Sequence, residues 1–283
     1  MRSAERIMAW SCVAAALLGG CKRWRDRGAD AGAVDAGPRG PAPVELPTED
    51  RWQLVGTLHP GADGTTGAVL LLHQLGSNRG EWQPLVALLQ RPPAVTVLTL
   101  DLRGHGDSVQ GPQSARQTWE GFGEDPARWA GLPRDAVAGA RYLFTTNAGA
   151  VRSLVVVGSS IGGAAAVAGL ADEPRVVGLA MISPGVAYHG LDALGPMRAY
   201  AVLPTLPART AWMMAAAGDV ESARDLGTLA TEAPGMRIER SVVAGSDAHG
   251  VALLNAAPAR WGALEGYIRG VLRAPRRTAA AGH

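Results

Sequence analysis

The chain has 283 residues, 47% of them hydrophobic, which suffices for the core of a globular domain and excludes a disordered or fibrous protein. Its formal charge is +2, and its cations are arginines spread along the chain, apart from the single lysine, Lys22. Nucleic-acid binding would need a clustered basic face, so we expect no nucleic-acid partner.

The N-terminal segment is typical of an exported protein. Two arginines precede an apolar run over residues 7–18, which has the length of a signal-peptide core and is short for a membrane-spanning helix. The residues Leu18-Gly19-Gly20-Cys21 then resemble the lipobox of bacterial lipoproteins. This resemblance implies a signal peptide over residues 1–20, lipidation of Cys21 and anchoring to a membrane of the bacterial cell envelope.

An ordinary secretory signal, or a weak membrane anchor that contains a cysteine, is the alternative interpretation. Cys12 and Cys21 are the two cysteines of the chain, so the remaining body contains no disulfide. Residues 21–50 are rich in Gly, Ala, Pro and charge, which predicts a flexible tether. We expect one domain over residues 51–274 and a disordered tail over 275–283.

Within this domain, short apolar runs alternate with stretches of helical pattern. The runs predict strands at residues 53–58, 67–73, 94–101, 153–159, 176–183, 210–218 and 237–245. Helices are predicted at residues 81–90, 133–146, 162–171, 221–230 and 257–272. This alternation predicts an α/β fold with a mostly parallel sheet and helices on both faces. Ligands bind such sheets beyond the carboxyl ends of the strands.

The strand predicted at residues 153–159 runs into a G-x-S-x-G motif formed by Gly158, Ser160 and Gly162. In a sharp turn between a strand and a helix, this motif presents its serine as a nucleophile. The pattern alone is weak, because a chain rich in glycine and serine forms it by chance. Ser160 as a helix cap is the alternative. The segment lacks the glycine spacing of a dinucleotide site, and the chain lacks the G-K-[ST] ending of a P-loop.

A serine hydroxyl needs a base and an orienting acid to become a good nucleophile. Asp219 follows one predicted strand and His249 follows another, in the order Ser, Asp, His. Glu221 and Asp225 are alternatives for the acid, and Asp219 is also a candidate helix cap. The spacings typical of metal sites are missing, so we expect no metal.

The attack of a serine on a carbonyl also requires two donors that face the developing oxyanion. The backbone N–H of Ile161 is one candidate, and the other is expected from the loop His73-Gln74-Leu75-Gly76. The stretch "TLDLRGHGDS" at residues 99–108 is similar to a D-x-R-G-x-G-x-S loop. Together these motifs resemble the α/β-hydrolase superfamily, in particular its esterase and lipase-like serine hydrolases.

The resemblance implies an α/β-hydrolase fold, a short cap between Ser183 and Arg209, and no cofactor. It also implies a triad of Ser160, Asp219 and His249, with Leu75 as the second oxyanion donor. The family commonly has glycine at the position of Gln74, so a group on Gln74 is an alternative donor.

We therefore expect an exported serine hydrolase that cleaves a carboxylic ester or related acyl bond of a small molecule. A thioesterase, amidase, acyltransferase or carbon-carbon hydrolase with the same triad is an alternative. A lipoprotein that keeps the hydrolase fold only to bind ligands is another. Three aromatic residues, Trp119, Phe122 and Trp129, follow the D-x-R-G-x-G-x-S loop, and we expect them to brace a long loop rather than to line a pocket.

Overall fold

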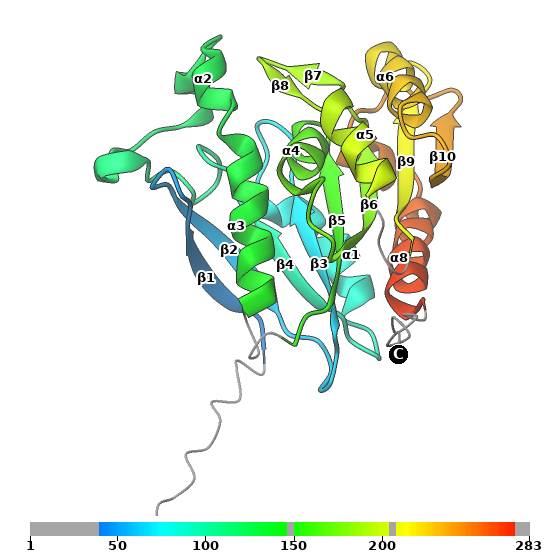
Figure 1. Cartoon of the computed structure of the whole chain (residues 1–283), viewed down its shortest axis with the longest axis horizontal. Helices are drawn as coiled ribbons and strands as arrows, with labels where there is room; N and C mark the ends of the chain where they lie inside the picture. The colour runs from blue at the N-terminus through cyan, green and yellow to red at the C-terminus, as the bar shows by residue number, and fades with distance from the viewer. Residues whose placement is uncertain (1–39, 146–149, 204–207, 275–283) are drawn as a thin grey trace, which may run out of the picture. The chain divides into compact units, whose positions relative to one another are not determined.

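The fold is described from a computed structural model, which covers residues 40–145, 150–203 and 208–274 (Figure 1). These residues belong to one compact unit, Gly37–His283. The predicted signal peptide, Cys21, most of the predicted tether and the predicted tail lie outside the described residues. Within these residues no helix is both long and apolar enough to cross a bilayer.

An eight-stranded sheet forms the centre of the unit, in the order β1-β2-β4-β3-β5-β6-β9-β10 (Figure 1). The strands are β1 Ala42–Pro47, β2 Gln53–His59, β3 Gly67–Leu72, β4 Thr96–Leu100, β5 Ser153–Ser159, β6 Val176–Ile182, β9 Thr210–Ala216 and β10 Arg237–Val243. Strand β2 is antiparallel to β1 and β4, and every other pairing in the sheet is parallel. The predicted mostly parallel sheet is confirmed.

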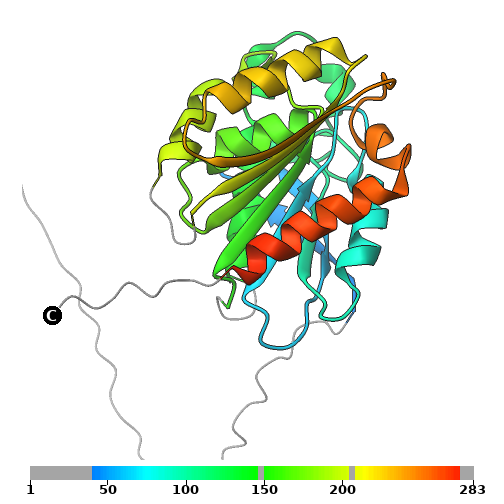
Figure 2. The ribbon, with the colours of Figure 1, turned by 90° about the vertical axis from the view of Figure 1, so that its right-hand side faces the viewer.

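Helices cover both faces of this sheet, as Figure 2 shows with α8 in red on one face and α4 and α6 on the other. The helices are α1 Gln83–Leu89, α2 Pro126–Trp129, α3 Leu132–Thr145, α4 Ile161–Leu170, α5 Leu194–Val202, α6 Val220–Thr231, α7 Val251–Asn255 and α8 Pro258–Arg273. Short 3-10 helices are η1 Arg79–Trp82, η2 Pro112–Ser114 and η3 Trp119–Phe122.

The continuous apolar runs of the central strands follow from this layered arrangement. In β5, Val155 and Val157 pack into the core beneath α1 and α8, whereas Leu154 and Val156 pack into the core beneath α3 and α4. Both sets are fully buried, so polar residues at alternate positions would be desolvated without a partner. The run of valines is therefore the sequence pattern that a strand covered on both faces requires.

Strand β1 lies inside the segment for which the sequence predicted a tether. Its Leu46 is buried and its Val44 half-buried, and it pairs with β2 from Ala42↔Leu58 to Pro47↔Gln53. Its prolines fit an edge strand, where one side of the backbone needs no partner. The tether prediction was therefore wrong from Ala42 onward, because the prolines concealed the two-residue alternation.

The predicted short cap contains more structure than the sequence indicated. Between β6 and β9 the chain forms a small hairpin of β7 Ala187–Tyr188 and β8 Leu191–Asp192, followed by α5. In α5, Met197 and Tyr200 are buried in the main core, so they are not available to contact a substrate. The hairpin is the part of the cap that approaches the candidate site.

The D-x-R-G-x-G-x-S loop is a structural brace for the loop that carries Leu75. The buried carboxylate of Asp101 accepts hydrogen bonds from the backbone N–H of Arg79 at 2.6 Å and of Asp107 at 2.9 Å, and it pairs with the Arg79 guanidinium. At Gly106 φ is +51°, and a Cβ there would lie 2.1 Å from Asp101 Oδ2. Glycine is required at this position by both the turn and the close carboxylate.

A second brace connects this loop to α3. The buried Arg103 guanidinium pairs with Asp135 of α3 at 2.7 Å and with Asp50 at 2.7 Å. Phe122 and Trp129, both buried, pack edge to face at 5.2 Å in the segment that follows. The predicted bracing role of these two aromatic residues is confirmed, because their rings form part of the core.

Candidate active site

Ser160 occupies the sharp turn between β5 and α4 that the G-x-S-x-G motif predicts. Its φ of +50° and ψ of −119° fall in a region that non-glycine residues rarely adopt. The conformation is held by a hydrogen bond from its N–H to Ile182 O at 2.8 Å and by one to its own carbonyl from Gly163 N–H at 2.9 Å. Strain that the surrounding backbone maintains in this way is typical of a functional position.

The two glycines of the motif are required because the backbone approaches itself closely at this turn. A Cβ at Gly158 would lie 2.3 Å from Gly163 N, within the first turn of α4. A Cβ at Gly162 would lie 2.4 Å from Leu72 O, at the end of β3. Neither contact can be relieved by rotating a side chain, so any larger residue would displace the turn that carries Ser160.

His249 and Asp219 are brought together from the ends of two parallel strands. Asp219 follows β9 and immediately precedes α6, and His249 lies in the loop after β10. His249 Nδ1 and Asp219 Oδ2 are 2.7 Å apart, and the side chains are 48% and 14% exposed. Burial alone would raise the pKa of Asp219, but hydrogen bonds from His249 and Ser222 lower it. The carboxylate is therefore stabilised as an anion beside the imidazole.

The two alternative acids do not pair with His249 among the described residues. Asp225 accepts hydrogen bonds from the backbone N–H of Val186 at 3.0 Å and from Arg224 Nε at 3.0 Å. Glu221 lies in the first turn of α6 and is exposed. The geometry favours Asp219 over both.

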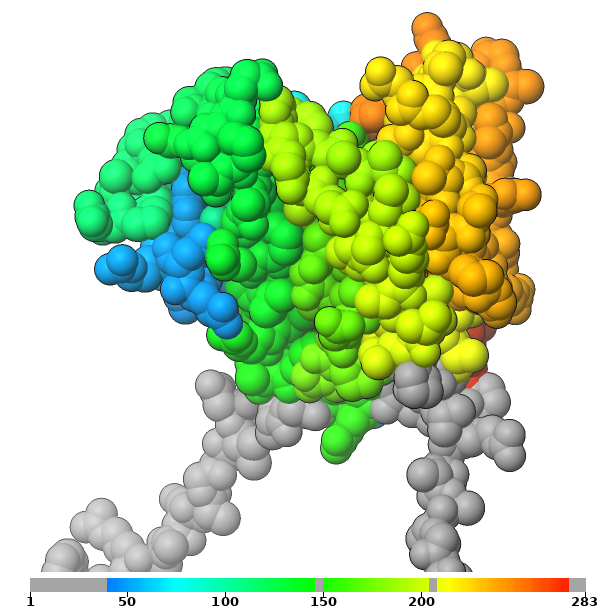
Figure 3. Space-filling model, turned by 45° about the horizontal axis from the view of Figure 1, so that its top comes forward, coloured from blue at the N-terminus to red at the C-terminus, as the bar shows by residue number. Residues whose placement is uncertain are grey.

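Ser160 and His249 line one cavity of about 420 Å³ at the carboxyl ends of the strands. In Figure 3 the surface is hollowed between the yellow atoms of α6 and the yellow-green atoms of the β7–β8 segment. The lining combines apolar side chains with hydroxyl and acidic groups: Gln74, Leu75, Ser160, Ile161, Ala164, Ser183, Pro184, Gly185, Ala187, Tyr188, Glu221, Ser222, Asp225 and His249. No hydrogen bond joins Ser160 Oγ to His249 in the described part of the chain.

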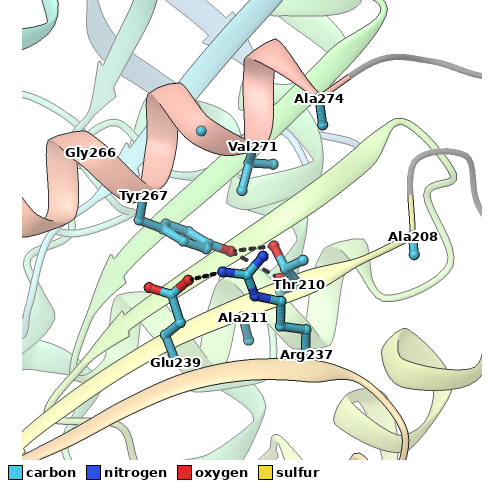
Figure 4. A pocket seen from close by; sticks show the side chains of 10 residues that line it. Ala208, Thr210, Ala211, Arg237, Glu239, Gly266, Tyr267, Val271 and Ala274 are labelled. Carbon is cyan, nitrogen blue, oxygen red and sulfur yellow. Dashed lines mark hydrogen bonds and ion pairs between the residues drawn. The ribbon is translucent and has the colours of Figure 1, made fainter.

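A second cavity, of about 340 Å³, lies at the opposite, amino ends of β9 and β10 beside α8 (Figure 4). Tyr267 Oη there is 3.0 Å from Thr210 Oγ1, and Arg237 pairs with Glu239 at 2.8 Å. The described residues that line this cavity include no serine, cysteine or histidine. It therefore lacks the nucleophile and base that the first cavity contains.

The orientation of Leu75 follows from the protonation of His73. Burial lowers the pKa of His73 to about 3, so its imidazole is neutral. Its Nε2 accepts a hydrogen bond from Leu102 N–H at 2.9 Å, which leaves the proton on Nδ1 to donate to Gln74 O at 2.7 Å. In the trans peptide between Gln74 and Leu75, the C=O and the N–H point in opposite directions. Because Gln74 O faces His73, the Leu75 N–H is directed away from His73.

Two backbone donors are available at the cavity. Leu75 and Ile161 both line it, and within residues 40–145, 150–203 and 208–274 neither backbone N–H donates a hydrogen bond to another protein group. Ile161 is the first residue of α4, so the partial positive charge at the helix N-terminus adds to its N–H. This pair can serve as an oxyanion hole.

The side-chain oxygen of Gln74, a residue that lines the cavity, lies between two hydrogen-bond donors. Gln74 Oε1 accepts hydrogen bonds from Ser159 Oγ at 3.0 Å and from Val251 N–H at 3.1 Å. These contacts engage the oxygen and leave Nε2–H as the donor of this side chain, so the Leu75 N–H and Gln74 Nε2 both stay candidates for the second oxyanion donor. Sequence reasoning missed these contacts, since Ser159 and Val251 are distant from Gln74 in the chain.

Glu81 is a further residue of this loop that the sequence did not indicate. Its Oε1 accepts a hydrogen bond from Gln74 N–H at 3.2 Å, whereas its buried Oε2 has no partner in the described residues. Burial raises the pKa of Glu81 to about 7, although hydrogen bonds from Ser77 and Gln74 act in the opposite direction. The carboxyl group therefore gains a proton near neutral pH.

We expect Glu81 to make the protein less stable as the pH rises from 4.5 to 7. In this interval the unfolded chain has lost the proton, since the ordinary pKa is 4.5, while the folded protein retains it. The free energy of unfolding should fall by about 3 kcal/mol at most and level off above pH 7. In urea unfolding, the Glu81→Gln variant should not show this fall in the free energy of unfolding. The Glu45→Gln variant should still show it, because Glu45 is an exposed residue of β1. Identical pH profiles for Glu81→Gln and the wild type would contradict this assignment.

Comparisons with known proteins agree with this architecture. A family model described as the alpha/beta hydrolase family matches residues 69–281. An esterase from Pyrococcus furiosus is similar in structure, with 17% identity and a TM-score of 0.62 over 82% of this chain and 91% of that chain. A dienelactone hydrolase from Anabaena variabilis has 16% identity and a TM-score of 0.58 over 84% and 98%.

A peroxisomal alpha/beta-hydrolase from Saccharomyces cerevisiae is also similar, with 14% identity and a TM-score of 0.62 over 86% of this chain and 92% of that chain. No curated protein matches the chain. At these identities the solved structures support the fold alone. The family model spans most of the domain, and on that basis the chain belongs to the alpha/beta hydrolase family.

Proposed function

We propose that this protein is a serine hydrolase that cleaves carboxylic esters through a triad of Ser160, His249 and Asp219. The observation that carries the proposal is the strained turn that presents Ser160 to the same cavity as His249, whose Nδ1 is 2.7 Å from Asp219. If Ser160 only packed in the core, its backbone would not need this strain. If Ser160 only capped α4, the pair of Asp219 and His249 beside it would not be needed.

In the proposed reaction, Ser160 Oγ attacks the ester carbonyl carbon while His249 Nε2 takes the hydroxyl proton. His249 Nδ1–H donates a hydrogen bond to the Asp219 carboxylate, so Nε2 is the nitrogen left free to act as the base. The carbonyl oxygen becomes an oxyanion and accepts hydrogen bonds from the N–H groups of Leu75 and Ile161. His249 then returns the proton to the departing alcohol as the carbon–oxygen bond breaks.

The acyl group is then bound to Ser160 as an ester. His249 takes a proton from a water molecule, the resulting hydroxide attacks the acyl carbon, and the same oxyanion hole stabilises the second tetrahedral intermediate. Collapse of that intermediate releases the carboxylic acid and returns the proton to Ser160. The two steps together consume one water and one ester.

The cavity favours a compact acyl group without negative charge. Its described lining contains Glu221 and Asp225 but no lysine or arginine, so a substrate carboxylate would be repelled and left without a partner. Leu75, Ile161 and Ala164 provide apolar surface next to Ser160. Short neutral esters are therefore the substrates that we propose.

A fluorophosphonate probe tests the proposal directly. We expect the folded protein to be labelled once, at Ser160, as read by mass spectrometry of the peptide. The labelled protein should lose its hydrolysis of p-nitrophenyl acetate and butyrate in proportion to labelling. Absence of both labelling and hydrolysis would instead support a ligand-binding protein without catalysis. Hydrolysis rates of matched amide and thioester substrates, measured beside the esters, distinguish an esterase from an amidase or a thioesterase.

A further inference from the structure

We infer that Gln74 is a positioning residue that holds the oxyanion loop, the nucleophile and the base in one arrangement. The inference rests on the proposed function, because it concerns how that site is assembled. Gln74 lies between β3 and η1, next to Leu75. Its side-chain oxygen accepts one hydrogen bond from the end of β5, next to Ser160, and another from the start of α7, close to His249.

The two donors lie beside the two reacting side chains. Ser159, whose Oγ is 3.0 Å from Gln74 Oε1, immediately precedes Ser160 and is fully buried. Val251, whose N–H is 3.1 Å from the same oxygen, follows His249 by two positions and begins α7. The sequence separations are 85 and 177 residues, so one oxygen joins segments that the chain itself does not hold together.

The contact with the base-carrying loop is tight. At Gly250 φ is +59°, and a Cβ there would lie 1.7 Å from Gln74 Oε1 and 2.7 Å from Ser159 Oγ. The Gly250 N–H also donates to the buried Ser183 Oγ at 2.8 Å. The peptide that follows His249 therefore lies directly against the Gln74 amide, and its position depends on that amide.

The backbone of Gln74 is held just as fully as its side chain. Its carbonyl accepts hydrogen bonds from His73 Nδ1–H at 2.7 Å and from Ser77 N–H at 3.2 Å, and its N–H donates to Glu81. The residue is thus anchored through its backbone N–H, its carbonyl and its side-chain oxygen, which makes that oxygen a rigid reference for the other two segments. A glycine here would leave the Ser159 hydroxyl and the Val251 N–H without this partner.

This arrangement predicts an effect on kcat more than on KM. Gln74→Met has a similar length but lacks the oxygen acceptor, so the loop after β10 should shift relative to Ser160. A misplacement of roughly 1 Å costs about 100-fold in rate, and we expect kcat for p-nitrophenyl acetate to fall about 30-fold or more. KM should change by less than about three-fold, because the apolar lining next to Ser160 is unchanged.

Gln90→Met is the matched control. Gln90 follows the last residue of α1, and its Nε2 donates a half-buried hydrogen bond to Val95 O at 2.8 Å, outside the cavity. Both variants should lose comparable thermal stability, but only Gln74→Met should lose kcat. If kcat of Gln74→Met stays within about three-fold of the wild type, the inference is overturned.

Two further measurements distinguish misfolding of Gln74→Met, failure of the role inferred for Gln74 and failure of the proposed hydrolase function. If Gln74→Met does not fold, by near-UV circular dichroism, Ser159→Ala replaces it: a fall in kcat of at least about five-fold supports the inference, and an unchanged kcat overturns it. Active-site titration of the wild type with the fluorophosphonate probe tests the hydrolase itself. Wild-type labelling together with full activity of Gln74→Met therefore refutes the role of Gln74 and leaves the proposed function intact.

Discussion

Ser160→Ala is expected to lower kcat for p-nitrophenyl ester hydrolysis by about 10⁴- to 10⁶-fold with little change in KM. The hydroxyl supplies the bond to the acyl group, and no other side chain at this turn can replace it. The variant should remain folded, since Ser160 Oγ makes no hydrogen bond to another described residue and alanine fits the same space. Stopped-flow and steady-state kinetics, with circular dichroism as the folding check, measure the effect.

Ser241→Ala is the matched control for this substitution. Ser241 is an exposed serine on the edge strand β10, away from the cavity, so its kcat should stay within about two-fold of the wild type. A Ser160→Ala protein that still hydrolyses the ester at more than a hundredth of the wild-type rate would remove Ser160 from the reaction.

Asp219→Asn is expected to lower kcat by about 10³- to 10⁴-fold, an order of magnitude taken from related triads. His249 is 48% exposed, so few packing contacts orient its ring apart from the 2.7 Å interaction with Asp219. An asparagine amide cannot stabilise the imidazolium that forms when Ser160 is deprotonated, and it can hold the wrong tautomer. Pre-steady-state kinetics should show a loss in the acylation step.

Asp247→Asn provides the comparison for Asp219→Asn. Asp247 is an exposed carboxylate two positions before His249, so this change alters the same local charge. It should leave kcat within about two-fold, because the loss in Asp219→Asn arises from a directed hydrogen bond rather than from net charge. Equal losses in both variants would indicate a general electrostatic effect and contradict the triad assignment.

Much of the fold could be predicted from local pattern. The run over residues 153–159 is apolar at every position but its ends and Gly158, and it forms β5 at the centre of the sheet. Strand β1 was missed because its prolines concealed a short alternation, and the β7–β8 hairpin because it has two residues in each strand. Short or irregular elements depend on neighbours that a local pattern does not describe.

In the candidate site, the position of Ser160 could be predicted from the sequence, but the side-chain partners could not. The G-x-S-x-G spacing places Ser160 at a turn, since the small residues on either side are a local requirement. The choice of Asp219 over Glu221 and Asp225 is decided by which carboxylate reaches His249. The contacts of Glu81 and Gln74 could not be predicted, because the motif at residues 73–76 describes the course of the backbone and not the side-chain partners.

Local sequence is enough to predict the alternation of apolar strands with helices, the small residues around Ser160 and the order of the candidate triad. These properties depend on residues close together in the chain, where side-chain size and periodicity decide the backbone. The lipidation of Cys21, which was inferred from the residues next to it, stays a prediction. The three-dimensional fold, by contrast, is needed to show that Asp219 meets His249 across 30 residues and that Gln74 joins Ser159 to Val251. Such contacts depend on strand order and on the path of each loop, because hydrogen bonds require atoms within about 3 Å of each other.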